Sequence, residues 1–409
     1  MKFTQLLYKQ HIGKALRYLW YHQRDKTIPV TRSNEILASM NIPVIDAKDI
    51  ISPQNGISSS NSKTIEEPIT LNEIDTNQKS IRCLTLGDCY TLQEGVPQAC
   101  LLTKTIKLDD ELPNKVKDLI TDIPDNINNI VKRFVSTSVI YDAQQVKLPK
   151  LKDPERPAWV FPRVYGICST RKMLNLSKKF LQLCESLSGL NIAQHRSIVH
   201  DGLSSICIGK ENNLFKFSLK MDIMMTSSTP LSPIADINIA NSLDMPNLHP
   251  LHYTIGLSKL DINESEDVYP ISMESPLSNA HTIFINHDPE EVKNITELPV
   301  TENQIHARSL IKSFSIAANC ARRRFGSDVK HLPEPIVVQC VQSDGQNFHF
   351  SVYQLNTLDL DGDEGTRNFW WSEPSIKLYE QAQYIKGQPC LEGYTSDVFK
   401  RFHAFYNNQ

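Results

Sequence analysis

One stretch of the sequence approaches a phosphate-binding loop. Gly202 is followed by six residues, then by Gly209 and Lys210, and the next residue is Glu211. A loop that wraps nucleotide phosphates has four residues between its glycines and a Ser or Thr after the lysine, because the hydroxyl must reach Mg²⁺. The spacing therefore predicts no phosphate-binding loop here.

A second stretch imitates the start of a calcium loop. Asp359, Asp361 and Asp363 occupy the first, third and fifth positions of such a loop. The sixth position, where the sharp turn needs Gly, is Glu364, and the twelfth, where a Glu supplies two oxygens, is Trp370. We expect a solvated acidic turn that holds no metal ion.

No residue stands out as a catalytic group. The sequence has neither a G-x-S-x-G nor an H-E-x-x-H motif. His349 lies in a strand-like stretch, where a lone histidine is more often a satisfied surface group than a general base. From these motifs we therefore predict no catalytic, cofactor-binding or metal-binding residue, and on the motifs alone the function stays open. The alternative is a site assembled from scattered residues, such as a pocket lined by His349 and the carboxylates of 359–364.

Three clusters of basic residues could contact phosphates or a protein partner. Arg322, Arg323 and Arg324 fall in the last turn of an expected helix, where cations also interact favourably with the helix C-terminus. These two roles are compatible, so both stay open. The other two clusters are Lys150, Lys152 and Arg156 in a proline-rich connection, and Arg171 with Lys172 at the start of another helix.

Composition is that of an ordinary globular protein with reduced thiols. Apolar residues make up 40% of the 409 residues and charged residues 22%. The nine cysteines are odd in number and form no C-x-x-C pair, which argues against a disulfide framework or a zinc site. No apolar run approaches the roughly 18 residues that a membrane helix needs, so we expect no membrane span.

The N-terminal residues resemble a targeting segment. Residues 1–32 contain seven Lys or Arg and one acidic residue, Asp25, and their apolar residues can gather on one side of a helix. This basic, amphipathic pattern is typical of a mitochondrial transit peptide, and a surface helix is the alternative. Removal of these residues would change the formal charge from −3 to −9. The mature body would be acidic.

The rest of the chain divides by composition. Residues 33–80 are weakly patterned and include a Ser- and Asn-rich tract, which indicates an extended tail or linker. Residues 81–150 form the first part of a globular body. Prolines near 149–163 mark the best internal boundary, and 160–409 form the main body.

The expected elements are both helices and strands. Helical spacing predicts a helix from Ser169 to Gly189, a second after the capping-box pattern at Thr301–Gln304, and a third around Val398–Tyr406. Residues 204–219 read as a hairpin, and the eight prolines of 227–299 indicate a long irregular arm. The fold class is therefore mixed α/β, with antiparallel hairpins in a mixed sheet that amphipathic helices cover.

The clearest hairpin spans Ile336 to Leu355. We expect a three-residue turn at 343–345, which pairs Cys340 with Phe348 and Val338 with Phe350 on one apolar face. This register leaves Gln339, His349 and Ser351 on a wetter face.

These residues also carry a resemblance to a known family. The run from Val337 to Asp361, continuing through Glu364-Gly365, and the earlier blocks at 92–105 and 112–116 are similar to the family of animal mitochondrial large-ribosomal-subunit protein thirty-seven. The similarity is strong from residue 301 on and weak between 125 and 300. A sister family in the same subunit, also described as a programmed-cell-death protein, carries a related Gln354–Thr357 stretch and is the nearest alternative.

The resemblance implies a structural protein of the mitochondrial ribosome, in the matrix, with no enzyme activity. It implies contacts with other large-subunit proteins, including the sister, and with ribosomal RNA through the three basic clusters, and it gives no reason to expect a homo-oligomer. A protein that coats RNA unaided is usually basic over a face, so an acidic body is expected to be held mainly by proteins. A soluble mitochondrial enzyme and a free adaptor protein are the other classes.

Overall fold

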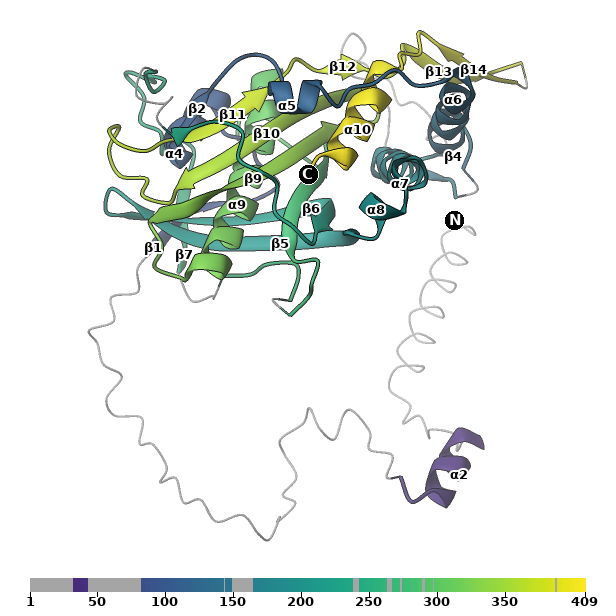
Figure 1. The fold of residues 1–409 in the computed structure, drawn as a ribbon, viewed down its shortest axis with the longest axis horizontal. Helices are drawn as coiled ribbons and strands as arrows, with labels where there is room; N and C mark the ends of the chain where they lie inside the picture. The colour runs from purple at the N-terminus through teal and green to yellow at the C-terminus, as the bar shows by residue number, and fades with distance from the viewer. Residues whose placement is uncertain are drawn as a thin grey trace, which may run out of the picture. The chain divides into compact units, whose positions relative to one another are not determined.

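The structure is a computed structural model that describes residues 32–42, 82–142, 144–148, 165–237, 243–262, 267–272, 274–288, 291–296, 298–386 and 388–409 (Figure 1). The chain forms two units, residues 1–76 and 77–409. In the first unit the described residues form one exposed helix, α2 (Arg32–Ser39). The predicted transit peptide, and the predicted linker after residue 42, lie outside the described residues.

The second unit is built on one ten-stranded mixed sheet. Its strands follow the order β2-β11-β10-β9-β8-β6-β1-β7, with β12 paired to β10 and β5 paired to β6. The pairs β8–β9, β1–β6 and β2–β11 are parallel, whereas the hairpins β5–β6 and β9–β10 are antiparallel. The mixed α/β fold class is therefore confirmed. The strand bounds are β1 Arg82–Leu86, β2 Thr105–Lys107, β5 Arg196–Lys210, β6 Asn213–Ser227, β7 Ser258–Ile262, β8 Asn279–Asn286, β9 His331–Ser343, β10 Asn347–Thr357, β11 Asn368–Ser372 and β12 Ile376–Lys377.

Helices cover both faces of this sheet. Val338 and Cys340 of β9 pack in the same apolar cluster as helix α9 (Glu302–Phe325). Their neighbours Val337 and Val341 point to the other face, into a cluster with α7 (Ser169–Ser188) and α10 (Asp397–Asn407). Because successive side chains of a strand alternate between faces, both faces of β9 carry apolar residues. The central strands are consequently buried on both sides.

The register of the β9–β10 hairpin differs from the sequence prediction. Val341 pairs with Phe350, Gln339 with Val352 and Val338 with Tyr353, so the predicted three-residue turn is wrong. The turn centres on Gly345, whose φ of 94° favours glycine, and the Asp344 carboxylate accepts bonds from the N–H groups of Gln346 and Asn347. Gln339, His349 and Ser351 are all buried, at 0, 2 and 0% exposure. The prediction failed because it assumed one wet face, and neither face is wet.

The stretch predicted as an irregular arm contains a central strand. β8 lies between β6 and β9 and has six consecutive buried residues, Ala280 to Ile285. The arm prediction is therefore wrong for 279–286, and also for β7 at 258–262, which pairs with β1 at the edge of the sheet. Elsewhere in the arm, Tyr253 and Tyr269 pack against the α9 cluster. This cover explains why α9 is buried around its whole circumference from Ser309 to Ala321.

The three predicted helices are present. The N-terminus of α9 has the predicted capping box, in which Thr301 Oγ1 accepts from Gln304 N and Gln304 Oε1 accepts from Thr301 N. In α7 the hydroxyls of Ser169 and Thr170 do not cap the helix and donate instead to Asp288. The remaining elements are α4 Val96–Thr103, α5 Asn114–Lys117, α6 Asp125–Val139, α8 Leu190–Ala193, and the small pairs β3 Val146–Lys147 with β4 Tyr165–Gly166 and β13 Gln381–Ile385 with β14 Gln388–Glu392.

Candidate functional site

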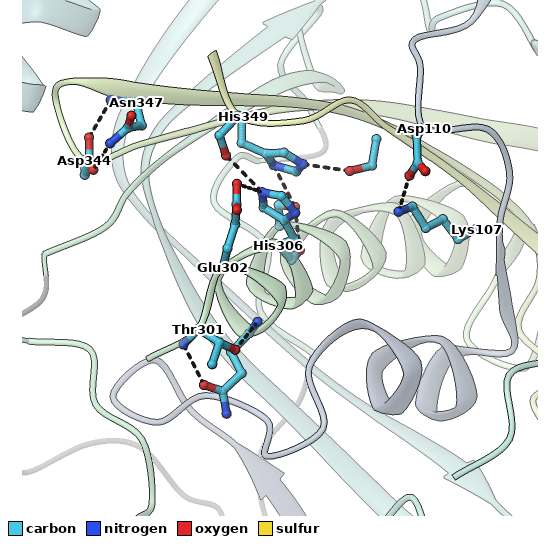
Figure 2. A network of polar contacts seen from close by, with 12 residues as sticks. Lys107, Asp110, Thr301, Glu302, His306, Asp344, Asn347 and His349 are labelled. Carbon is cyan, nitrogen blue, oxygen red and sulfur yellow. Dashed lines mark hydrogen bonds and ion pairs between the residues drawn. The ribbon is translucent and has the colours of Figure 1, made fainter. Parts of the chain in front are cut away.

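A polar cavity lies between the first turns of α9 and the β9–β10 turn. Its volume is about 490 Å³. Figure 2 shows Glu302 and His306 of α9 close to His349 of β10, with Asp344 and Asn347 at the neighbouring turn. The lining residues are His287, Glu302, Ile305, Gln342, Ser343, Asp344, Asn347, His349, Ser375 and Lys377.

Two stacked imidazoles stand beside this cavity. The rings of His306 and His349 are 3.8 Å apart and nearly parallel, at 16°. Burial, followed by the neighbouring His306, holds the pKa of His349 well below its usual range, and burial also lowers the pKa of His306. Both rings are therefore neutral at pH 7. The two neutral rings therefore stack on each other as aromatic groups and carry no positive charge.

The hydrogen bonds of these histidines do not form a catalytic relay. A general base in a serine-type site bonds the nucleophile through one ring nitrogen and a carboxylate through the other. In His306, Nε2 faces both Ser375 Oγ at 3.1 Å and Glu302 Oε1 at 3.6 Å. The ring nitrogens of His349 face two hydroxyls, with Nε2 2.8 Å from Ser372 Oγ and Nδ1 3.5 Å from Ser309 Oγ.

The acidic turn near residue 361 belongs to a different place. Asp361 lines a separate cavity with Lys210 and Arg322, and the cavity that His349 lines contains none of the 359–364 carboxylates. The Asp361 carbonyl accepts from Lys104 Nζ at 2.7 Å, and Asp361 Oδ1 accepts from Glu211 N at 2.7 Å. These oxygens are thus engaged by the protein. In the described part of the chain, no group of three or more His, Cys, Asp or Glu is arranged to hold a metal ion.

The three consecutive arginines lie in the last turn of α9, as predicted, and each has a contact within the fold. Arg322 bonds Asp267 Oδ2 through Nη1 at 2.6 Å and the Cys207 carbonyl through Nη2 at 2.7 Å. The Arg323 guanidinium lies over the Tyr269 ring, 4.3 Å from its centroid. The most exposed, Arg324, pairs with Glu334 at 3.3 Å. Arg322 and Arg323 therefore hold the arm against α9, whereas Arg324 faces solvent.

The other two basic clusters are not brought to this place. Lys150, Lys152 and Arg156 lie outside the described residues. Arg171 and Lys172 start α7, on the opposite face of the sheet from α9. The Arg171 side chain forms a two-pronged pair with Asp142, whose pKa it lowers to about 2. The structure therefore does not bring α7 and α9 together as a single basic surface.

A buried ion cluster on α9 was missed from the sequence. Lys312, 4% exposed, lies 2.6 Å from Asp88 Oδ1, and Arg308 lies one turn earlier at 3.8 Å from the same oxygen. Burial, and then the charge of Arg308, lowers the pKa of Lys312. Removal of one partner from such a cluster leaves an uncompensated buried charge. A lysine within an otherwise helical apolar pattern gives no sign that it points inward, so no pattern in the sequence identifies this cluster.

No described helix is both long enough and apolar enough to cross a membrane.

Comparisons with known proteins give matches over most of the chain. Residues 291–409 match the family described as "Mitochondrial 28S ribosomal protein S30 (PDCD9)". Three relatives carry the name "Large ribosomal subunit protein mL37". The protein from Rattus norvegicus is 28% identical over 79% of this chain and 74% of its own length, that from Gallus gallus 26% over 80% and 75%, and that from Mus musculus 27% over 81% and 76%.

The two kinds of match name different subunits. The family description refers to the small subunit and covers the C-terminal 291–409, whereas the relatives are large-subunit proteins and match about four fifths of the chain. The matches to the mL37 proteins are much longer than the match to the family model. They carry more weight for the whole protein.

Proposed function

We propose that this chain, which belongs to the mL37 family, is a structural constituent of the large subunit of the mitochondrial ribosome. The observation that carries the proposal is the similarity to mL37 proteins over about four fifths of the chain and three quarters of each relative. The relatives are named as ribosomal proteins, not as enzymes. The protein accordingly supports mitochondrial translation by its shape and its surfaces.

The charge of the chain favours attachment mainly through proteins. The formal charge is −3, and residues 1–32 carry seven of the 43 Lys and Arg residues against one acidic residue. A protein that binds RNA phosphates over a broad face needs a matching excess of Lys and Arg. If residues 1–32 are a transit peptide, as their pattern predicts, the body that enters the matrix has a charge of −9. Neighbouring ribosomal proteins then provide most of the contact area, and RNA is touched locally.

Arg324 is the best placed of the α9 arginines for an RNA phosphate. Its partner Glu334 has a side chain that is 68% exposed, and exposed ion pairs contribute little to stability. The guanidinium can therefore leave Glu334 for a phosphate at small cost. Arg322 and Arg323 are committed to Asp267 and Tyr269 and act by orienting this helix end.

The remaining basic residues are proposed as separate contacts. We expect Arg171 and Lys172, at the start of α7, to form one contact with RNA or a protein partner. Lys150, Lys152 and Arg156, in the connection before α7, are expected to form another. The proposed protein partners include the sister family member. We expect a single copy of this chain in each large subunit.

Sedimentation of a mitochondrial lysate tests the function. The endogenous protein should migrate with the intact large subunit, and it should shift to lighter fractions when the subunit is unfolded with EDTA. A protein that stays at the top of the gradient while the large subunit remains intact would contradict the proposal. The readout is the position of the wild-type protein in the gradient, so the experiment needs no variant.

A further inference from the structure

Three glutamines of the central strands are buried, and two of them have complete sets of hydrogen-bond partners. The amide of Gln339 donates to Thr282 Oγ1 at 2.8 Å and to the Phe405 carbonyl at 3.0 Å, and accepts from Asn408 Nδ2 at 2.8 Å. The amide of Gln354 accepts from the N–H groups of Ile234 and Ala235 and donates to the Ala235 carbonyl and to Asn356. Such satisfaction is the rule for buried amides.

The third glutamine, Gln342, breaks this rule. It is 2% exposed, and neither Oε1 nor Nε2 has a hydrogen-bond partner within the described part of the chain. It stands on β9, opposite His349 of β10, and lines the cavity between α9 and the β9–β10 turn. A second group at the same cavity, Nδ1 of His287, is also buried without a partner. A buried polar group without a partner destabilises the fold, so this arrangement indicates a polar group that arrives from outside.

The orphaned atoms define what that group must offer. A carboxamide presents one acceptor and one donor side by side, and its complement is a group with one donor and one acceptor at the same spacing. In an extended segment the backbone N–H and C=O groups of one residue point to the same side and offer such a pair.

The rim of the cavity decides between a polypeptide and RNA. Glu302 and Asp344 are exposed carboxylates, Lys377 is the one ammonium among the lining residues, and the imidazoles of His287 and His349 have lowered pKa values and are neutral. The rim is therefore net negative, which repels a phosphodiester and attracts a cationic side chain.

We propose that this cavity docks an extended segment of a neighbouring ribosomal protein, with the backbone N–H and C=O of one residue bonded to the Gln342 amide and a Lys or Arg side chain directed at Glu302. The inference rests on the proposed function, because it requires a neighbouring chain in the large subunit. The cavity is then a protein–protein anchor on the α9 face. Gln342 is kept polar for assembly and not for the stability of the free chain.

The substitution Gln342→Met separates assembly from stability, since Met fills a similar volume with no polar amide. Because the buried unsatisfied amide is removed, the Tm of the free full-length chain should stay equal or rise. Because two hydrogen bonds to the neighbour are lost, incorporation into the large subunit, measured by gradient sedimentation, should fall roughly five-fold or more. The matched control is Gln354→Met, which removes an amide whose hydrogen bonds are all made within the free chain. Its Tm should fall by about 2–4 °C.

A photoreactive amino acid in place of Lys377 identifies the occupant in the assembled subunit. The expected adduct joins this chain to another protein. The inference would be overturned by an adduct with RNA alone, by no adduct in the assembled subunit, or by unchanged incorporation of Gln342→Met. A fall in the Tm of Gln342→Met like that of Gln354→Met would also overturn it, because an internal water would then satisfy the Gln342 amide. If the wild-type chain does not sediment with the large subunit, the proposed function fails first, and the two failures are distinguishable.

Discussion

Asn408, at the end of α10, should be a stabilising residue of the central sheet. Its side-chain Nδ2 donates to Gln339 Oε1 at 2.8 Å, while its backbone carbonyl accepts from His281 Nε2 at 2.9 Å and from Arg196 Nη2 at 2.6 Å. Asn408 is 9% exposed, and both Gln339 and His281 are 0% exposed. The end of α10 is thereby tied to strands β9, β8 and β5.

The substitution Asn408→Ala removes one of these bonds and leaves Gln339 Oε1 buried without a partner. A neutral hydrogen bond contributes about 1 kcal/mol, and an orphaned buried acceptor adds about 1–3 kcal/mol. The backbone carbonyl of residue 408 is unaffected, so its bonds to His281 and Arg196 remain. We expect the free energy of unfolding to fall by about 2–4 kcal/mol.

Urea unfolding of the full-length chain, followed by the fluorescence of the buried Trp370 and Trp371, measures this change. The control is Asn407→Ala, because Asn407 on the same turn contacts only the half-buried His403; its effect should stay within about 0.5–1 kcal/mol. In a double-mutant cycle, Gln339→Leu should couple to Asn408→Ala by about 1 kcal/mol or more, since the orphaned oxygen is then absent. Equal stabilities of Asn408→Ala and wild type would refute the reasoning.

Three further results follow from the structure. Burial, and then the charge of Arg196, lowers the pKa of His281 from 6.5 to about 3, so between these pH values the unfolded chain binds more protons than the folded one. The free energy of unfolding should therefore fall by about 1.4 kcal/mol per pH unit of acidification from this group. Urea unfolding at pH 7 and pH 5 should show a smaller loss for His281→Gln than for the wild type. The capping-box variant Thr301→Ala should lower the free energy of unfolding by about 1 kcal/mol, measured against Thr301→Ser, which keeps the oxygen; equal losses in both variants would contradict this. Charge reversal of Arg324 should reduce incorporation into the large subunit with little change in Tm. By contrast, Arg322→Ala should lower Tm, because Asp267 and the Cys207 carbonyl lose their hydrogen-bond donor. Unchanged incorporation of the Arg324 variant would mean that Arg324 acts only on the helix C-terminus.

The helices could be predicted because their signals are local. The capping box at Thr301, the stop at Gly189 and the apolar spacing of α10 involve residues within a few positions of one another. The hairpins were found for the same reason. The end of α9 with its three arginines was also placed correctly.

The register of β9–β10 could not be obtained from alternation. Alternation selects a register only when one face is wet, and here α9 covers one face while α7 and α10 cover the other. Gln339 looked like a solvent-facing residue because its partner, Asn408, is 69 residues away. Strand β8 was missed because prolines before and after it outweighed a strand of eight residues.

The polar cavity has no signature in the sequence. It joins α9, the β9–β10 turn and β12 with His287 after β8, and its distinguishing feature is the missing partner of Gln342. A glutamine that lacks a partner looks, in the sequence, like Gln339 or Gln354, which have them. Only the arrangement of side chains in the structure separates these three residues.

A density map of the mitochondrial large subunit from the source of this chain tests the central claim most directly. The account predicts density for the ten-stranded sheet with α9 on one face and α7 and α10 on the other, in one copy per subunit. A complete large subunit whose map contains no such body would contradict it.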